Sequence, residues 1–240
     1  MKGIILAGGI GSRLQPLTHV TTKHLLPVGP YPMIYHPLYK LRQIGIRSIM
    51  IVTSRWNAGD MIRVLGSGSE MGVSITYRVQ EEAGGIAQAL ALAEDFVNGG
   101  PVVVLLGDNI FYDHLGPFTE AFRQQKEGAK ILLKQVSEPE RYGIAELENG
   151  QIVSLAEKPS NPRSNYAVTG IYMYDSSVFD IIRKQKPSKR GELEITDVNR
   201  EYLRRQSLTF DFLPNWWVDA GTHQSLLEAN RLASTMDLQI

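Results

Sequence analysis

The 240-residue chain is long enough to bury one sizeable core, and 43% of its residues are hydrophobic. Its 25 Lys and Arg residues balance 25 Asp and Glu residues, so no overall field favours a nucleic acid or an anionic membrane as a partner. The absence of cysteine excludes a disulfide scaffold, a thiolate nucleophile and a cysteine-ligated metal. No apolar run approaches the roughly 18 residues of a membrane-spanning helix, and the first apolar run is too short for a secretory signal. We therefore expect a cytoplasmic protein with no nucleic-acid or membrane partner.

Short runs rich in β-branched and apolar residues alternate with helical patterns along the first part of the chain. The expected strands cover residues 3–6, 48–52, 73–79, 102–106 and 129–136, and the expected helices cover residues 33–44, 58–65, 86–96 and 118–126. This alternation predicts an α/β fold with a mostly parallel, doubly wound sheet and helices on both faces. Ligands of such sheets bind beyond the carboxyl ends of the strands, so functional residues are expected at that edge.

The second part of the chain has a different pattern. Two alternating strands flank the Asn149-Gly150 dipeptide, which is typical of a tight hairpin turn, and an extended run follows at residues 166–174. Two further helices are expected, with Thr196 and Thr222 as their capping residues. These elements predict a hairpin-rich layer over the site.

A glycine-rich loop follows the first expected strand. Gly8, Gly9 and Gly11 let backbone N–H groups approach a ligand closely, and Arg13 adds a fork of donors, a combination that suits a polyphosphate. The spacing is not that of a Walker A loop, which ends in Lys and then Ser or Thr, nor that of the dinucleotide fingerprint, because Leu14 occupies the third glycine position. A plain tight turn is the alternative interpretation of the loop.

Two aspartates stand at the ends of apolar, strand-like runs. Asp108 follows residues 102–106, and Asp219 follows an aromatic run near the end of the chain. Carboxylates in these positions suit Mg²⁺ held together with substrate phosphates, although aspartates also form turns and cap helices. Lys23 lies just past the glycine loop and can reach the same anion; a solvated lysine is the alternative.

The residues Glu157 and Lys158 follow the expected hairpin, and they pair a carboxylate with a cation. This pair suits a sugar phosphate, because the carboxylate accepts from hydroxyls and the cation binds phosphate. Arg190 adds a second cation for that phosphate. An exposed charge pair at a strand end is the alternative.

A series of motifs, in order along nearly the whole chain, resembles the bacterial glucose-1-phosphate thymidylyltransferases. The motifs are GGIGSRLQPLT, KHLLPV, YPMIYHPL, LGDNIF, ERYGIAEL, EKP, SNYAVTGIY, RGELEITDVNR and DAGTHQSL. The glycine loop, LGDN and EKP are typical of sugar nucleotidyltransferases in general, whereas SNYAVTGIY and RGELEITD are similar to the thymidylyl group specifically. The resemblance implies a Rossmann-like nucleotidyltransferase fold.

The resemblance also implies a role for each matching residue. Those implied at the triphosphate of dTTP are Gly8, Gly11, Ser12, Arg13 and Lys23. Those implied at the thymine are Gln80 and Gly85, and those implied at Mg²⁺ are Asp108 and Asp219. Those implied at glucose are Asn109, Gly143, Glu157 and Val168, and those implied at its phosphate are Lys158 and Arg190.

We expect a single domain of residues 1–240, with a nucleotide-binding part over about 1–136 and a sugar-binding part over about 137–240. The implied reaction joins dTTP and α-D-glucose 1-phosphate to give dTDP-glucose and pyrophosphate, with Arg13, Lys23, Asp108, Lys158 and Asp219 as the catalytic residues. A nucleotidyltransferase for another pyrimidine or sugar, or a non-catalytic nucleotide-sugar binding subunit, is the alternative.

The resemblance further implies a homo-oligomer and a part in deoxysugar synthesis, for example of L-rhamnose. Many relatives continue as a helical segment beyond the position of Ile240. From that difference we expect inhibition by dTDP-L-rhamnose to be weak and competitive with dTTP.

Overall fold

The computed structural model describes residues 1–234, 236 and 238, and within these residues the largest element is a nine-stranded sheet. One side of the sheet is parallel, as expected, because β1 pairs in parallel with both β4 and β6, and β4 pairs in parallel with β5. These strands are β1 (Lys2–Ala7), β4 (Ser48–Ser54), β5 (Ser74–Gln80) and β6 (Val102–Leu106). Their carboxyl ends lie along one edge, where the sequence places the glycine loop and Asp108.

The other side of the sheet is built around β11 (Tyr166–Tyr174), which runs antiparallel to β6, β8 and β9. The remaining strands are β8 (Ala129–Gln135), β9 (Gly143–Glu148), β10 (Gln151–Glu157) and β12 (Leu208–Phe212). The carboxyl-terminal half of β11 pairs with β6 and its amino-terminal end pairs with β9, so the sheet is continuous across both parts of the chain. Strand β12, which lies parallel to β8, was not expected from the sequence.

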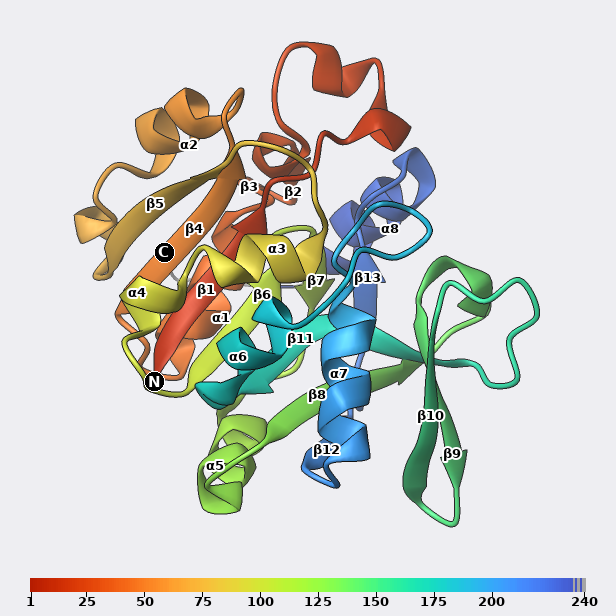
Figure 1. Ribbon diagram of the computed structural model, residues 1–240. Helices are drawn as coiled ribbons and strands as arrows, with labels where there is room; N and C mark the ends of the chain where they lie inside the picture. The colour runs from red at the N-terminus through yellow and green to blue at the C-terminus, as the bar shows by residue number, and fades with distance from the viewer. Residues whose placement is uncertain (235, 237, 239–240) are drawn as a thin grey trace.

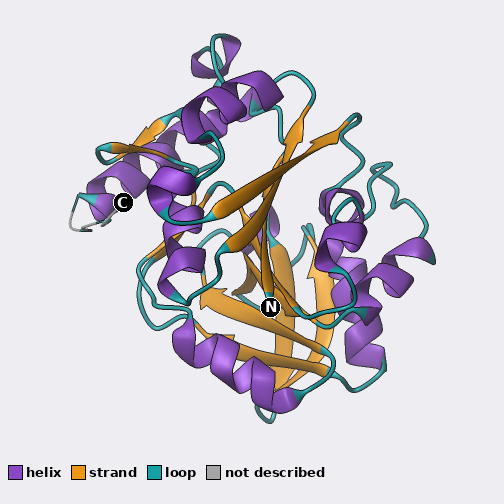
Figure 2. Ribbon diagram, turned by 90° about the vertical axis from the view of Figure 1, so that its left-hand side faces the viewer, coloured by secondary structure: helices purple, strands orange, loops and turns teal. Residues whose placement is uncertain are grey.

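Helices cover both faces of this sheet, which confirms the doubly wound expectation (Figures 1 and 2). One face carries α3 (Ile86–Ala91), α4 (Glu94–Val97), α6 (Ser177–Arg183) and α7 (Ile195–Arg204), whose apolar side chains share a core with β1 and β6. The opposite face carries α1 (Tyr35–Gln43), α2 (Ala58–Leu65) and α5 (Gly116–Gln125). None of the helices in the described part of the chain has the length and apolarity needed to cross a bilayer.

A separate core cluster lies beside the sheet and holds the glycine loop in place. Here α8 (His223–Ala233) packs Leu226 and Ala229 against Leu14, which follows the loop, and against Ala220. Small elements complete this region: β2 (Pro27–Val28), β3 (Tyr31–Pro32), β7 (Asn109–Phe111), β13 (Trp217–Asp219) and 3-10 turns at Ser12–Leu14, Leu17–His19 and Lys23–Leu25. Two more 3-10 turns lie at Ser69–Met71 and Pro139–Arg141.

Two local expectations are confirmed. Strands β9 and β10 form the hairpin, with Asn149 at φ 50° and Gly150 at φ 75°, the left-handed pair that a tight hairpin turn requires. Helix α8 begins after Thr222, whose hydroxyl accepts from the Ser225 N–H in a capping box.

Two others are wrong. The expected helix over residues 86–96 is two short helices, α3 and α4, because the chain turns at Leu92 and Ala93, where the Ala93 N–H donates to the Leu90 carbonyl. Thr196 does not cap α7: Glu194 is the N-cap residue, and the Thr196 hydroxyl donates to Glu157 instead.

Candidate active site

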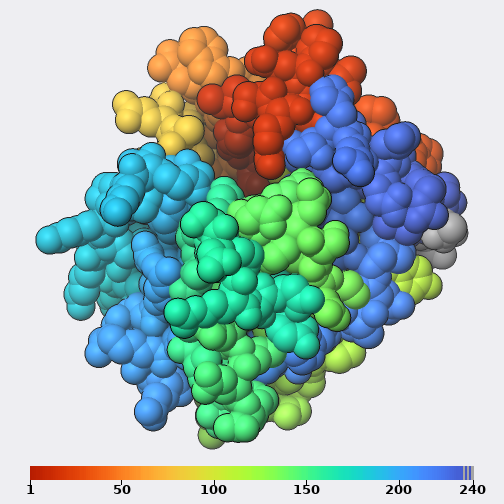
Figure 3. All heavy atoms as spheres, turned by 90° about the vertical axis from the view of Figure 1, so that its right-hand side faces the viewer, coloured from red at the N-terminus to blue at the C-terminus, as the bar shows by residue number. Residues whose placement is uncertain are grey.

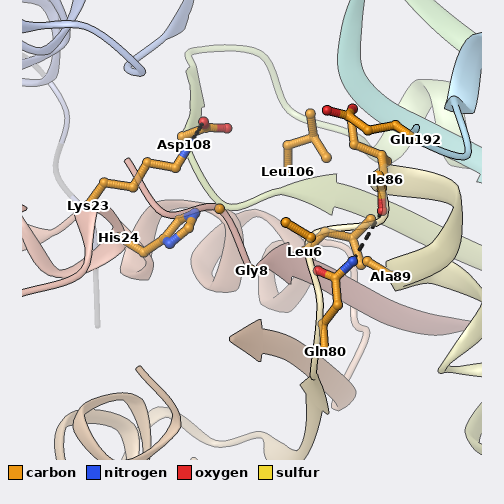
Figure 4. A pocket seen from close by; sticks show the side chains of 13 residues that line it. Leu6, Gly8, Lys23, His24, Gln80, Ile86, Ala89, Leu106, Asp108 and Glu192 are labelled. Atoms are coloured by element: carbon orange, nitrogen blue, oxygen red, sulfur yellow. Dashed lines mark hydrogen bonds and ion pairs between the residues drawn. The ribbon is translucent and has the colours of Figure 1, made fainter. Parts of the chain in front are cut away.

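A cavity of about 240 Å³ opens at the carboxyl ends of β1, β5 and β6. In Figure 3 a hollow lies between the N-terminal loop, drawn red, and the green and cyan segments of the second part. Figure 4 shows how Gln80, Ile86 and Glu192 line one end of the cavity, while Lys23 and Asp108 line the other. The cavity therefore has an apolar end and a charged end, and a single ligand can contact both.

The three loop glycines serve different purposes. Of these described residues, Gly11 has the positive φ, 74°, whereas Gly8 and Gly9 do not use the left-handed region. A Cβ at Gly8 would overlap Gln80 Oε1, and a Cβ at Gly9 would lie 3.4 Å from Lys23 Nζ. Of the three glycines, Gly11 therefore provides left-handed backbone, and Gly8 leaves room for the Gln80 side chain.

The two aspartates, far apart in sequence, are brought together by a small sheet. Strand β13 pairs antiparallel with β7 so that Asp219 lies opposite Asn109, and the Ala220 N–H donates to the Asp108 carbonyl at 2.9 Å. A Cβ at Gly221 would lie 2.8 Å from both Arg13 Nη2 and Asp219 Oδ1, so the Arg13 guanidinium flanks this pair.

The charges at this end differ in their surroundings. Asp108 forms an ion pair with Lys23, and both side chains are 12% exposed. Burial alone would raise the pKa of Asp108, but the Lys23 ammonium holds it well below its usual range. Burial, together with the nearby Asp108 charge, raises the pKa of Asp219 to about 6. Within the described residues Asp219 Oδ1 is buried without a hydrogen-bond partner.

That arrangement fits a divalent cation. An orphaned carboxylate oxygen beside a second carboxylate is a hard oxygen donor set, which Mg²⁺ prefers. The residues that the structure describes contain no group of three or more His, Cys, Asp or Glu side chains able to hold a metal. One or two carboxylates, with phosphate oxygens and water as the other ligands, match the way Mg²⁺ binds with nucleotides.

Asn109 holds Asp108 from the other side. Its side-chain oxygen accepts from the Gly170 N–H at 2.9 Å and from Trp217 Nε1 at 2.7 Å, and its amide nitrogen donates to Asp108 Oδ1 at 3.1 Å. Asn109 is only 2% exposed, so it positions the carboxylate. Its expected contact with glucose stays a prediction. Trp217 thus supports Asp108 through its bond to Asn109.

The apolar end of the cavity, where the base is expected and which we call the base end, holds an amide pair. Gln80 Nε2 donates to Gln88 Oε1 at 2.8 Å and to the Gly85 carbonyl at 3.3 Å. Gln88, which the sequence reasoning missed, also accepts from the Gly84 N–H at 3.1 Å. Its position in an ordinary helical pattern carries no signal of this role.

The residues expected at the sugar form a second cluster. Glu157 Oε2 accepts from the Thr196 hydroxyl at 2.5 Å, and a Cβ at Gly143 would lie 3.4 Å from the same oxygen and 3.9 Å from Val168. Lys158 Nζ lies 3.7 Å from Glu157 Oε1. Thr196 was expected as a helix cap, and the structure gives it this positioning contact instead.

Arg190 joins the sugar cluster to the base end. Its guanidinium lies 3.5 Å from both Glu157 and Glu194 and 3.0 Å from Glu192, which lines the cavity. The same segment is tied to the base end, because the Leu193 N–H donates to the Gly84 carbonyl at 2.8 Å. The residues expected at the sugar phosphate and at the base are therefore linked through this segment, whereas Asp219 lines a separate cavity.

A family model described as nucleotidyl transferase matches residues 2–235. The glucose-1-phosphate thymidylyltransferase of Neisseria meningitidis is 46% identical over 98% of this chain and 83% of its own length. That of Mycolicibacterium smegmatis is 45% identical over 100% of this chain and 84% of its own length. The chain belongs to the nucleotidyl transferase family, among the glucose-1-phosphate thymidylyltransferases. This confirms the resemblance stated from the motifs, and the chain is an enzyme of the nucleotidyltransferase class.

Solved structures of this family confirm the fold. The crystal structure of a putative glucose-1-phosphate thymidylyltransferase from Bacillus anthracis, in complex with sucrose, superposes with a TM-score of 0.97. That protein is 60% identical, and the match covers 100% of this chain and 98% of that one. A UDP-glucose pyrophosphorylase in complex with UDP-glucose superposes with a TM-score of 0.86 at 25% identity, covering 96% of this chain and 97% of that one.

Proposed function

We propose that this nucleotidyltransferase transfers a thymidylyl group from dTTP to α-D-glucose 1-phosphate, giving dTDP-glucose and pyrophosphate. The observation that carries the proposal is the pairing of β7 and β13, which brings Asp219 opposite Asn109 and so close to Asp108, with Lys23 paired to Asp108 and Arg13 near Asp219. Two carboxylates and two cations gathered in one place suit a metal-bound triphosphate.

In the proposed reaction a phosphate oxygen of glucose 1-phosphate attacks the α-phosphorus of dTTP. The bond from that phosphorus to the oxygen bridging to the β-phosphorus breaks, and pyrophosphate leaves with the electron pair. The attacking group is already an anion, so no general base is required. The chief obstacle is repulsion between two polyanions, which fixed cations and precise alignment reduce.

The chain's residues would divide this work by position. Gly8, Gly11, Ser12, Arg13 and Lys23 would hold the triphosphate, and Gln80 and Gly85 would contact the thymine. Glucose would lie against Asn109, Gly143, Glu157 and Val168, with its phosphate bound by Lys158 and Arg190. Asp108 and Asp219 would hold Mg²⁺, which when bound neutralises phosphate charge.

The test is pyrophosphate release from each of dTTP, dUTP, dCTP and UTP combined with the 1-phosphates of glucose, galactose and mannose. We expect dTTP with glucose 1-phosphate to give the highest kcat/KM, and we expect chelation of Mg²⁺ to stop release until the ion is restored. A higher kcat/KM for another pair would support a nucleotidyltransferase of different specificity. Binding of both substrates with no release from any pair would support a non-catalytic subunit.

The two parts of the chain would bind different substrates. Residues 1–136 would bind mainly the nucleotide, and residues 137–240 mainly the sugar phosphate, within a single domain. A homo-oligomeric state, a cytoplasmic location and a supply of dTDP-glucose to deoxysugar synthesis stay predictions.

A further inference from the structure

Two glutamines at the base end of the cavity form an amide pair whose direction is set by the backbone. The Gly84 N–H can only donate, so the atom of Gln88 that faces it at 3.1 Å must be its carbonyl oxygen. The Gly85 carbonyl can only accept, so the atom of Gln80 that faces it must be its amide nitrogen. Both assignments agree with the 2.8 Å bond from Gln80 Nε2 to Gln88 Oε1.

Two glycines make room for this pair. A Cβ at Gly8 would overlap Gln80 Oε1, and a Cβ at Gly84 would overlap the whole amide group of Gln88. These glycines lie on different segments, one after β1 and one before α3, and a side chain at either would displace a different glutamine amide. The present positions of both amides therefore depend on the absence of a side chain at these two points.

The bonds leave one group of the pair available. The two hydrogens of Gln80 Nε2 are directed to Gln88 and to Gly85, whereas no residue in the described part of the chain donates to Gln80 Oε1. Gln80 lines the cavity (Figure 4), and the walls beside it are apolar: Leu6, Ile86, Ala89 and Leu106. An acceptor in such surroundings requires a donor from the ligand, since an unpaired buried carbonyl is costly.

We infer that Gln88 is a positioning residue that sets base selectivity, by holding the Gln80 carbonyl toward the base so that the site takes a pyrimidine with an N3–H donor. This inference rests on the proposed function and deepens it. Thymine and uracil carry a hydrogen on N3, whereas N3 of cytosine is a lone-pair acceptor that would face the Gln80 oxygen. Sites built on such a hydrogen bond reject the mismatched partner far more strongly than apolar contact does.

Without Gln88, the amide of Gln80 keeps only its longer bond, 3.3 Å from Nε2 to the Gly85 carbonyl, so its nitrogen is held away from the base less firmly. Rotation of the amide by half a turn then presents Nε2 to the cavity, and that donor matches cytosine N3. The loss of Gln88 should therefore weaken the use of dTTP and improve the use of dCTP at once. A purely structural role would lower both together.

The test compares Gln88→Met, which keeps the length of the side chain and removes the acceptor, with Gln88→Glu, which keeps an acceptor for Gln80 and Gly84. The kcat/KM values for dTTP and dCTP are measured on the same preparation at saturating glucose 1-phosphate, so the fraction of folded enzyme cancels in their ratio. In Gln88→Met we expect the preference for dTTP over dCTP to fall at least about tenfold, with kcat/KM for dCTP rising. In Gln88→Glu we expect the preference to stay within about threefold of wild type. Gln151→Met, at an exposed position in β10, is the matched control and should leave the ratio unchanged.

An unchanged ratio in Gln88→Met, or an equal fall of the ratio in Gln88→Glu, would overturn the inference. These outcomes are separate from a failure of the proposed function, which would appear in the wild-type enzyme as a preference for cytosine nucleotides or as no pyrophosphate release.

Discussion

The two ends of the cleft differ in how their charged groups are held. At the triphosphate end, Lys23 and Asp108 are each 12% exposed, and Asp108 is held by Asn109 as well. At the sugar-phosphate end, Lys158 and Arg190 are 46% and 42% exposed, and their partner carboxylates lie 3.0–3.7 Å away. The first end is organised before a substrate arrives, whereas the cations of the second are held by ion pairs that cost little to exchange, because exposed pairs are weak.

This difference indicates at which end a substitution should lower activity most. Removing a buried, hydrogen-bonded group leaves its partner without compensation, which is costly in a dry site. Removing an exposed cation such as Lys158 loses an ion pair that water already screens, so the effect falls mainly on the substrate that the cation would bind.

The largest effect is expected for Asp108→Asn. The change removes one charge from the proposed metal site and keeps the shape of the side chain, so turnover should fall at least about a hundredfold, roughly 2.7 kcal/mol of barrier, with the fold kept. The measurements are kcat at saturating Mg²⁺ and the thermal unfolding midpoint. Asp60→Asn, in the first turn of α2, is the matched control and should leave kcat unchanged. Activity of Asp108→Asn within about tenfold of wild type would show that the metal role is wrong.

A smaller effect is expected for Gly8→Ala. The added Cβ would overlap Gln80 Oε1, so the amide at the base end must shift, and KM for dTTP should rise about tenfold. Initial rates at varied dTTP and at varied glucose 1-phosphate separate the two constants, and KM for the sugar phosphate should stay unchanged. Gly59→Ala, where nothing lies within 4 Å of the added Cβ, is the control. The interpretation of the loop glycines fails if Gly8→Ala keeps the wild-type KM for dTTP.

The smallest effect concerns stability in acid. It depends on a buried histidine in residues 1–136, so it tests the effect of burial apart from the ion pairs of the two ends. Burial lowers the pKa of His36, on α1, to about 4. Between pH 6.5 and about 4 the unfolded chain binds a proton there that the folded chain does not, so the unfolding free energy should fall as the pH falls through this window. The slope from one such group is at most about 1.4 kcal/mol per pH unit.

Urea unfolding of wild type and His36→Gln at several pH values measures this contribution. The variant should show a shallower loss of stability between pH 6.5 and 4, whereas His19→Gln, at an exposed position, should follow wild type. Parallel curves for His36→Gln and wild type would contradict the prediction.

Much of the first end could be predicted from the sequence, because the rule that parallel strands present their carboxyl ends at one edge places Gly8 beside Asp108 once the strands are recognised. That Asp108 and Asp219 lie close together was suggested by their positions at strand ends and by the family resemblance, but the pairing that brings them together could not be predicted. That pairing joins β7 and β13, and three-residue strands carry no periodic signal.

Local sequence patterns could not predict the roles of residues whose hydrogen-bond partners follow from the fold. Thr196 precedes an apolar helical run, which favours a capping role, but its hydroxyl is used by Glu157 across the fold. Gln88 fits any amphipathic helix, and its role follows only from the turn that brings the Gly84 N–H to it.

The most direct test of the division of the cleft between two substrates is the pair of Michaelis constants in Arg13→Ala and Lys158→Ala. Arg13 lies near Asp219 at the proposed triphosphate end, and Lys158 lies beside Glu157 at the proposed sugar end. The account predicts that Arg13→Ala raises KM for dTTP about tenfold or more and leaves KM for glucose 1-phosphate near wild type, and that Lys158→Ala does the reverse. Equal rises of both constants in both variants would contradict it.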